Sequence, residues 1–587
     1  MLKFEIKDRD AAGRLASLSL RTKRISTPVF LPVYNPHIPT IAPKEMERDF
    51  GIEAIMVNAY LIYKDPVLKE LALRKGIRGL LDFDGAIFSD SGAYQTFRGQ
   101  VPITQSEILR FQSELGVDVG VMLDVPSRHE SRSETMASVL ATIERAEEWN
   151  RIIGEMGGIT PCWEGTIQGG AFEDLVRLSC LKMRRFPFDL FAVGVPPKLW
   201  KNYAFKEIVL QGLTAKRSLP FSKPLHAFGM GNPIVLPILV AIGYDIFDSA
   251  SYSLYAKDGR YMTEFGTKKL EELSYFPCQC PICIGHTPEE IRSLPSEERT
   301  KLLAKHNLYT ILREVKTIRQ AIVENNLWEL VQQRARAHPK LLEALFEALR
   351  KGRGLFEELD PIWKRSAFMY SGPESLHRIE LKRAFKRLKA RLSATRFKVP
   401  SALRGVYPFG QAIVPKGIFQ FEEGGKPESS LEIVRVIADY QFGSGVGRAL
   451  FPEEVEVELS KATGRIRRVW LGKQLLATIA PRDGFLRLRF LGALRLHKAL
   501  ASPSYRVVLK EDVEVEEIVA KGGNVFARFV SHCDPRIIPR EEALVTDSKD
   551  RLLAVGQALL SGKEMTIFRY GLALKTRDCL GNFMSFE

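Results

Sequence analysis

Three cysteines form the densest group of metal-binding side chains in this sequence. Cys278, Cys280 and Cys283 follow the pattern Cys-x-Cys-x₂-Cys, with Pro277 and Pro281 stiffening the turn. Three thiolates need one more ligand to close a tetrahedral zinc site, which leaves no open coordination position. His286 and His306 are both candidates, and spacing alone does not choose between them. The pattern predicts a structural metal rather than a catalytic one. The alternative is that the three thiols bind no metal.

Acidic and amide side chains end several short apolar runs in the first 250 residues. The candidates for one shared site are three aspartates and a glutamine: Asp90, Asp124, Gln168 and Asp248. Parallel strands of a barrel bring their carboxyl ends to one rim, where active sites lie. Any single aspartate is also an ordinary turn residue at the end of a strand. Their joint placement favours one catalytic site.

Eight strand candidates must position these residues. They cover 30–33, 54–58, 86–90, 119–124, 164–168, 191–195, 225–229 and 245–250. Amphipathic segments separate many of them, and the one at about 132–153 has apolar residues at helical spacing. Eight strand-and-crossover units predict an α/β fold, a (β/α)₈ TIM barrel with a zinc-binding subdomain. Periodicity does not exclude a doubly wound sheet.

The rest of the chain predicts further, smaller domains. Residues 287–395 are helical in pattern, and short alternating strands and turns follow residue 399. Between residues 378 and 404, ten basic residues stand against one acidic residue, as in a solvated helix face or a phosphate-binding surface. We expect a barrel domain over 1–350, with its zinc subdomain at about 270–310. Three regions follow it: a basic linker with a first C-terminal domain over 351–430, a second α+β domain over 431–503, and a last module over 504–587.

Composition narrows the choice of partners and compartment. The 587 residues carry a net charge of +15 and an isoelectric point near 9.3, which favours a polyanionic partner such as RNA. No apolar run approaches the roughly 20 residues of a membrane span, and the N-terminus is polar, unlike a signal peptide. Seven cysteines, an odd number, indicate a reducing compartment. We therefore expect a cytoplasmic protein that does not bind membranes.

Five ordered blocks of the sequence resemble the signature blocks of tRNA-guanine transglycosylases. They are FSDSGAYQ (88–95), TIQGG (166–170), FAVGV (191–195), FGMG (228–231) and DIFDSASYSLYAKDGRYMT (245–263). The cysteine group followed by a histidine is similar as well. The tail that begins KGGNVFARFV resembles a PUA module. A barrel with a long extension and such a tail resembles the archaeal, archaeosine-forming branch of the family.

The resemblance implies roles for the matching residues. Asp248 matches the nucleophile that forms a covalent glycosyl-enzyme, and Asp90 matches the second acidic residue, which acts as general acid and base. His306, not His286, matches the fourth ligand of one structural Zn²⁺ per chain. The residues expected to contact the substrate are Ser91, Tyr94, Asp124, Gln168, Gly194, Val195 and Phe228.

These substrate contacts have distinct expected tasks. Asp124 and Gln168 would hydrogen-bond the guanine edge. Tyr94 and Phe228 would sandwich the flipped base, because stacking offsets part of the cost of unstacking. The loop at 194–195 would meet the substituent of a deazapurine ring.

The implied function is exchange of a guanine in tRNA, at position 15 of the D-arm, for free 7-cyano-7-deazaguanine. The family implies a homodimer. One alternative is the paralogous enzyme that forms archaeosine from the inserted nitrile base. A second is a non-catalytic tRNA-binding protein. A metal-dependent barrel hydrolase is the weakest, because only His226 lies on a predicted strand.

Overall fold

The computed structural model describes residues 2–97, 102–128, 131–157, 160–396, 398–422 and 429–584. Its chain forms two compact units. The first comprises Met1–Asp8, Ala12–Val323 and Leu330–Lys351. The second comprises Arg9–Ala11, Glu324–Glu329 and Gly352–Glu587. Within the described residues, every helix is too short or too polar to cross a bilayer.

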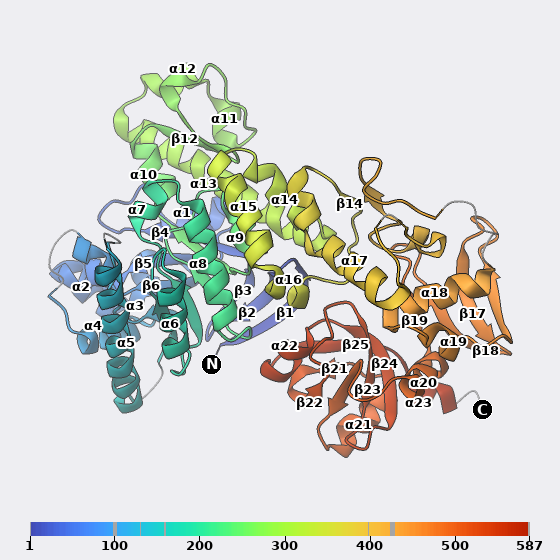
Figure 1. Ribbon diagram of the computed structural model, residues 1–587. Coiled ribbons are helices and arrows are strands. Elements are labelled where there is room, and N and C mark those ends of the chain that lie inside the picture. Colours follow the sequence, from blue (N-terminus) through green and yellow to red (C-terminus); the bar gives the residue numbers. More distant parts are fainter. Residues whose placement is uncertain are drawn as a thin grey trace. The chain divides into compact units, whose positions relative to one another are not determined.

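A closed barrel of eight parallel strands forms the centre of the first unit (Figure 1). Around the barrel the strands are ordered β10-β11-β4-β5-β6-β7-β8-β9. Each strand overlaps one of the eight sequence candidates, so the predicted TIM barrel is confirmed and the doubly wound sheet is excluded. The strands are β4 (Val29–Tyr34), β5 (Ala54–Asn58), β6 (Ala86–Asp90), β7 (Val119–Val121), β8 (Cys162–Ile167), β9 (Leu190–Val193), β10 (Leu225–Ala227) and β11 (Ile246–Ser249).

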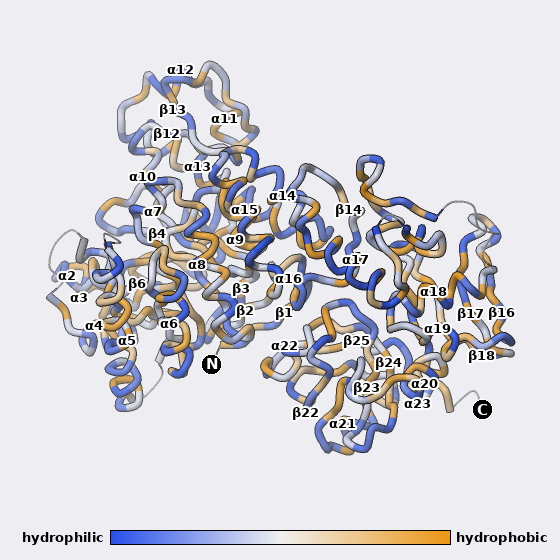
Figure 2. The backbone as a smooth tube through the Cα atoms, viewed as in Figure 1, coloured by the Kyte–Doolittle hydropathy of each residue, from blue (hydrophilic) through white to orange (hydrophobic). Residues whose placement is uncertain are grey.

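Amphipathic helices connect the barrel strands, and Figure 2 shows hydrophobic and hydrophilic segments alternating along them. α4 begins at a capping box, in which the Thr104 hydroxyl accepts from the Glu107 N–H and the Glu107 carboxylate accepts from the Thr104 N–H. The connecting elements are α1 (Pro43–Phe50), α2 (Ala59–Lys64), α3 (Pro66–Leu81), η1 (Ala93–Phe97), α4 (Gln105–Leu115), α5 (Arg132–Glu155), α6 (Glu173–Met183), α7 (Pro197–Lys201), α8 (Phe205–Ser218), α9 (Leu236–Ala241) and α10 (Ser251–Lys257).

Two additions complete the first unit. An antiparallel sheet precedes the barrel, made of β1 (Lys3–Asp10), β2 (Gly13–Ser19) and β3 (Arg24–Thr27). A small subdomain follows it, made of β12 (Arg260–Thr263), β13 (Gly266–Lys269), η2 (Leu270–Glu272), α11 (Pro281–Gly285) and α12 (Pro288–Ser293). The chain then continues through α13 (Ser296–Glu324), α14 (Leu327–Ala335) and α15 (Pro339–Lys351).

The second unit contains two larger sheets and a mixed helical region. A four-stranded antiparallel sheet consists of β16 (Val455–Leu459), β17 (Ile466–Leu471), β18 (Gln474–Ile479) and β19 (Leu486–Leu488). A six-stranded sheet is ordered β21-β25-β24-β23-β20-β22, and only β20 and β23 pair in parallel. Its strands are β20 (Arg506–Leu509), β21 (Val525–Phe526), β22 (Val530–Cys533), β23 (Glu542–Thr546), β24 (Leu552–Ala558) and β25 (Leu572–Cys579).

The remaining elements of this unit are short, apart from two longer helices. One shared apolar core includes residues of α17, α18, α20 and both larger sheets. The elements are α16 (Arg353–Leu359), β14 (Phe368–Met369), η3 (Pro373–His377), α17 (Ile379–Leu392), η4 (Ser401–Gly405), β15 (Ala412–Ile413), α18 (Ser430–Phe442), α19 (Val446–Leu450), α20 (Phe490–Ala499), α21 (Val513–Ala520), η5 (Ala527–Phe529), α22 (Gly562–Ile567) and α23 (Leu580–Met584).

Three arginines of the basic run over 378–404 have structural partners, which corrects the interpretation of these three as solvated or phosphate-binding. Five other basic residues of the run are exposed, and for them the interpretation stays a prediction. Arg383 is buried and donates to the last carbonyls of α16. Arg387 pairs with Glu541 at 2.8 Å, and Arg391 donates to the backbone oxygens at the end of α18. Sequence alone could not reveal these partners, because Glu541 lies more than 150 residues from Arg387. Phe397, an aromatic residue of the run, lies outside the described residues.

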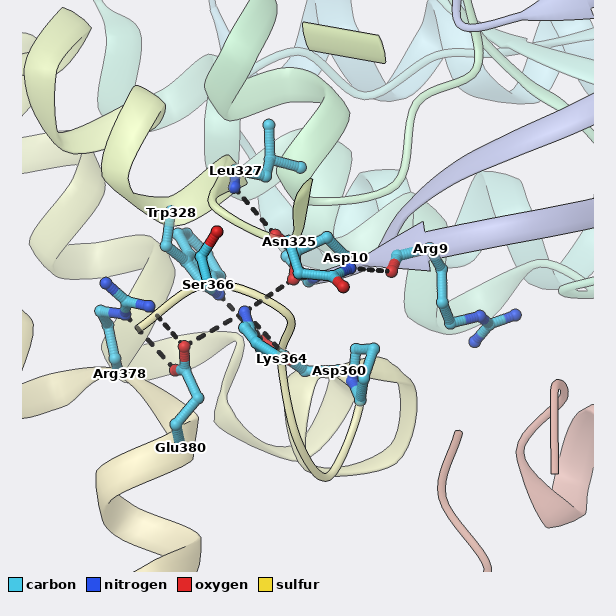
Figure 3. Close-up of polar contacts among 12 residues, drawn as sticks. Arg9, Asp10, Asn325, Leu327, Trp328, Asp360, Lys364, Ser366, Arg378 and Glu380 are labelled. Atoms are coloured by element: carbon cyan, nitrogen blue, oxygen red, sulfur yellow. Dashed lines mark hydrogen bonds and ion pairs between the residues drawn. The ribbon is translucent and has the colours of Figure 1, made fainter. Parts of the chain in front are cut away.

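A buried cluster of charges holds three segments of the second unit together (Figure 3). The Lys364 ammonium lies 2.7 Å from Asp10, 3.2 Å from Asp360 and 3.1 Å from Glu380, and all four side chains are buried. Burial lowers the pKa of Lys364, but the three carboxylates outweigh it and raise the pKa above its ordinary value. Arg378 adds a second cation to the cluster by pairing with Glu380. Lys364 is therefore charged in the folded protein.

Replacing Lys364 with methionine is expected to lower the free energy of unfolding of this unit by about 3–5 kcal/mol, because it leaves three buried carboxylates without their shared cation. Urea unfolding, followed by hydrogen exchange in α17, measures the change. Lys386→Met is the matched control, since the ion pair between Lys386 of α17 and Glu357 of α16 is exposed. Equal stability of the two variants would contradict the assigned role of Lys364.

Candidate active site

The polar residues predicted at strand ends all lie at one rim of the barrel. Asp90 is the last residue of β6, Gln168 directly follows β8, and Asp248 lies in β11. Asp124 comes three residues after β7, and Gly194 directly follows β9. Because the barrel strands are parallel, their carboxyl ends face the same side. Barrel closure thus brings together residues that are up to 158 positions apart (Asp90 and Asp248).

Asp90 is held by an amide from the neighbouring strand. The Asn58 Nδ2 donates to Asp90 Oδ2 at 2.8 Å, and these two residues are paired in the register of β5 and β6. Burial raises the pKa of Asp90 to about 6, helped by the charges of Asp248 and Glu164 and opposed by hydrogen bonds from Gly92 and Asn58. The charge of Asp248 contributes to this shift, as expected of two carboxylates at the same rim.

Asp124 and Gln168 form a second pair at the same rim. The Gln168 Nε2 donates to Asp124 Oδ2 at 2.6 Å, and both side chains are buried. Burial, together with the charge of Asp90, raises the pKa of Asp124 to about 7. Gly194 lies against this pair: a Cβ at that position would come within 3.1 Å of the Gln168 amide. A side chain at position 194 would therefore crowd Gln168.

Asp248 is held through one of its two carboxylate oxygens. Its Oδ1 accepts a hydrogen bond from the Gly229 N–H at 3.0 Å and lies 3.1 Å from His226 Nε2. Gly229 adopts φ 71°, in the left-handed region that glycine tolerates best. Within the described part of the chain, no hydrogen bond to Oδ2 is formed. That oxygen is available to a reacting atom.

Two charged residues of this site were not assigned a catalytic role from the sequence. Glu164 lies inside β8 and His226 inside β10, both fully buried, and His226 Nδ1 is 3.0 Å from Glu164 Oε1. A glutamate within the apolar run CWEGTI was the available signal, because buried carboxylates need a partner. From the sequence, Asn58 is only the polar last residue of the strand candidate at 54–58.

The other predicted substrate-contacting residues follow the carboxyl ends of β6, β9 and β10. Ser91 is buried, and among the described residues its hydroxyl has no hydrogen-bond partner. Tyr94 lies in η1 with 49% of its surface exposed, whereas Phe228 is half-buried beside the His226 ring, at 4.8 Å between centroids. Val195 is half-buried in the loop after β9.

The cysteine group and one histidine converge in the small subdomain. The ligand atoms of Cys278, Cys280, Cys283 and His306 all lie within 4.8 Å of one another. His306 Nδ1 is 3.3 Å from Cys283 Sγ and 3.5 Å from Cys280 Sγ. Three soft thiolates and an imidazole nitrogen are a donor set that fits a metal such as zinc.

The same contacts separate the two histidine candidates. His306 Nε2 lies 2.9 Å from the Met262 carbonyl oxygen, which leaves Nδ1 directed at the thiols. The Tyr261 ring stacks on His306 with centroids 3.7 Å apart. His286 Nδ1 instead lies 3.0 Å from the Ile282 carbonyl oxygen, outside the group of four. The group of four candidate metal ligands therefore contains His306 and not His286.

Three family models match successive parts of this chain. Residues 8–340 match the model described as queuine tRNA-ribosyltransferase. Residues 432–503 match the patch-forming domain C2 of tRNA-guanine transglycosylase, and residues 505–580 match the PUA domain. The first match covers the whole barrel, its rim residues and the cysteine group.

Curated relatives match nearly the full length of the chain. The tRNA-guanine(15) transglycosylase of Pyrococcus furiosus is 44% identical over 98% of both chains. The protein of that name from Korarchaeum cryptofilum is 42% identical over 96% of this chain and 95% of its own, and that from Methanothermobacter thermautotrophicus is 35% identical over 98% of both. These relatives and the family model, which matches more than half of the chain, agree with the carboxylates found at the barrel rim. This chain therefore belongs to the tRNA-guanine transglycosylase family of pentosyltransferases.

Proposed function

We propose that this protein replaces guanine at position 15 of archaeal tRNA with 7-cyano-7-deazaguanine, the first step of archaeosine formation, through a covalent aspartyl-ribosyl intermediate. The observation that supports this most directly is the placement of Asp90 and Asp248 at one rim of the barrel, with the Asp124–Gln168 pair at the same rim. Two carboxylates of different environment suit a reaction in which one attacks carbon and the other moves a proton.

The proposed reaction has two half-steps. Asp248 Oδ2 attacks C1′ of the nucleotide while the C1′–N9 bond to guanine breaks, and Asp90 delivers a proton to the leaving base. Asp90 is then a carboxylate, and it takes the N9 proton of the incoming deazaguanine. The new N9 attacks C1′ as the C1′–Oδ2 bond breaks, which returns Asp248 to its ionised form. Atoms and charge balance without a redox cofactor or nucleotide energy.

Recognition of the base follows from the remaining rim residues. Asp124 and Gln168 present a carboxylate oxygen and an amide to the guanine edge, and Ser91 supplies its unpartnered hydroxyl. Tyr94 and Phe228 stack on the two faces of the flipped base. The loop at 194–195 leaves room for the nitrile because residue 194 has no side chain. These assignments predict that free guanine and 7-cyano-7-deazaguanine compete for one site.

The cysteine group serves as a structural zinc site in this proposal. Cys278, Cys280, Cys283 and His306 would hold one Zn²⁺ per chain, and the closed ligand set would tie α11 to α13. The metal would take no part in base exchange, since no ligand position remains for substrate.

We propose that the other domains bind the tRNA. The proposed divisions are 1–350 for the barrel, 351–430 and 431–503 for two intermediate domains, and 504–587 for the PUA domain. A PUA domain and a positive net charge suit tRNA, which proteins hold by shape and phosphates. We further propose a cytoplasmic homodimer.

The function is tested by incubating the protein with tRNA that carries guanine at position 15 and with labelled 7-cyano-7-deazaguanine. We expect label in the tRNA and release of one guanine per tRNA, and no label in a transcript with adenine at that position. Mass spectrometry of the nucleosides identifies the product. Binding of tRNA without incorporation would favour a non-catalytic protein. Activity only on tRNA that already contains the nitrile base would favour the paralogous enzyme.

The pH dependence of exchange provides a separate test of Asp90. In the covalent intermediate Asp90 must be ionised to take the N9 proton, and its pKa of about 6 means that this carboxylate accumulates as the pH rises. The kcat/KM for the incoming base, which reports this second half-step, should therefore increase between about pH 5 and pH 7. In Asn58→Leu the hydrogen bond to the carboxylate is lost, which should raise the pKa of Asp90 and move this rise to higher pH. An identical pH profile in the variant would show that another group controls the acid limb.

A further inference from the structure

A chain of three charged side chains crosses the barrel interior below the rim. It runs from Glu164 in β8 to His226 in β10 and to Asp248 in β11. The His226 ring connects the other two, because Nδ1 is 3.0 Å from Glu164 Oε1 and Nε2 is 3.1 Å from Asp248 Oδ1. Both ring nitrogens therefore face a carboxylate at ion-pairing distance, an arrangement that suits the doubly protonated, positively charged ring.

The surroundings of this chain isolate it from solvent. Glu164 and His226 have no exposed surface. They come from alternate barrel strands, as residues of one interior layer do, and Phe88 of β6 packs edge-on against the His226 ring. Phe228 covers the same ring at 4.8 Å. Water cannot readily replace either carboxylate as the partner of the histidine.

The ionisable groups that face His226 are all acidic. They are Glu164 from β8 and Asp248 from β11, and the charges of both raise the pKa of Asp90 in β6. Burial lowers the pKa of His226, but Glu164 and Asp248 outweigh it and raise the pKa to about 9. A buried carboxylate pair without such a cation would be strongly unfavourable.

We propose that Glu164 and His226 are a positioning pair for the nucleophile: Glu164 keeps His226 protonated and oriented, and His226 fixes Oδ1 of Asp248 so that Oδ2 faces the ribose. This inference rests on the proposed role of Asp248. Glu164 and His226 touch neither substrate nor the reacting carbon, so they act only through Asp248.

The pair has a defined effect on both half-steps. When Oδ2 bonds to C1′, the carboxylate becomes an ester and loses its negative charge. When the new base attacks, the C1′–Oδ2 electron pair returns to Asp248 beside a positive charge that is already in place. No proton moves to or from His226 in either step. The imidazolium thus makes Asp248 a better leaving group at the second step without changing how tRNA binds.

The first experiment measures the pKa of His226 directly. Glu164→Gln keeps the size of the side chain and an oxygen for Nδ1 but removes the charge. An NMR titration of labelled histidine should show the pKa of His226 falling by about one unit or more in this variant. Glu164→Asp retains a charge and should restore part of the difference. An unchanged histidine pKa in Glu164→Gln would overturn the role of Glu164.

The second experiment follows base exchange against pH. The active form has protonated His226, so kcat should fall as pH rises through the pKa of this histidine. The fall should begin at lower pH in Glu164→Gln than in the wild type. Guanine ionises identically with both enzymes, so a shift between them belongs to the protein. An alkaline limb that does not move would overturn the proposal.

The third experiment removes the cation altogether. His226→Gln should lose about 100-fold in kcat, with KM for tRNA unchanged and no alkaline limb from the histidine. His338→Gln, which removes a histidine stacked on Tyr203 elsewhere in the unit, is the matched control and should match the wild type. Wild-type kcat in His226→Gln would overturn the proposal. An error in the proposed role of Asp248 as nucleophile would be detected separately, because the covalent adduct would then persist in an Asp248 variant.

Discussion

Replacing Asp248 with asparagine is expected to abolish both base exchange and the covalent protein–RNA adduct. The amide keeps the shape of the side chain, but its oxygen is a poor nucleophile and cannot form a stable ester with C1′. Loss of a nucleophile typically costs on the order of 10⁴-fold or more in kcat. Incubation with tRNA in the absence of free base, followed by denaturing electrophoresis, reveals the adduct, and labelled guanine incorporation gives the rate.

Asp90→Asn should block a different step of base exchange from the step that Asp248→Asn blocks. Its nucleophile is intact, so a slow single turnover should leave adduct that incoming base does not resolve, because no carboxylate takes the N9 proton. The two variants together separate attack on the ribose from proton transfer.

The control for both variants is Asp258→Asn. Asp258 is an exposed residue at the end of α10, and the same substitution there should leave exchange and adduct formation at wild-type levels. Unimpaired exchange in Asp248→Asn would refute the nucleophile assignment. Equal behaviour of Asp90→Asn and Asp248→Asn would refute the division of roles, because the first should still form adduct.

Loss of His306 is expected to remove the metal and unfold the subdomain that holds it. Binding free energy at a structural zinc site is folding free energy, about 10–16 kcal/mol in zinc-finger peptides, and a small subdomain has little apolar core to replace it. In His306→Gln, zinc content should fall from about one per chain towards zero. Hydrogen exchange over β12, β13 and α11 should become fast. Chelation of the wild-type protein should reproduce both effects.

His286→Gln is the matched control, since it changes the other histidine that follows the cysteines. The structure directs its Nδ1 to the Ile282 carbonyl, so full zinc content and slow exchange are expected. Zinc loss in His286→Gln with retention in His306→Gln would reverse the ligand assignment. Retention of zinc in both variants would place the metal elsewhere.

The sequence was sufficient to predict the barrel and the residues of its rim. Strand candidates could be recognised locally, because apolar runs that end in Asn58, Asp90 or Gln168 are short and are separated by amphipathic segments. Parallel closure then requires those ends to meet at one rim. The resemblance to known signature blocks supplied the proposed roles of Asp90 and Asp248, which no periodicity could provide.

Other features depended on contacts that the sequence does not encode locally. Glu164 and His226 stand 62 positions apart, and only the order of β8, β9 and β10 places one against the other. The arginines of α17 resembled a phosphate-binding surface because charge counts do not show which partners folding provides.

The sequence by itself determined the fold class, the family blocks and the set of metal-binding side chains, since each depends on residue type and spacing along the chain. Spacing left the choice of histidine open, and the family resemblance selected His306, which the tertiary structure brings to the thiols. Tertiary structure alone decided which arginines are buried and which oxygen of Asp248 has no hydrogen bond among the described residues. The physical reason is that hydrogen bonds and ion pairs act over about 3 Å, and only barrel closure and packing bring distant segments to that separation.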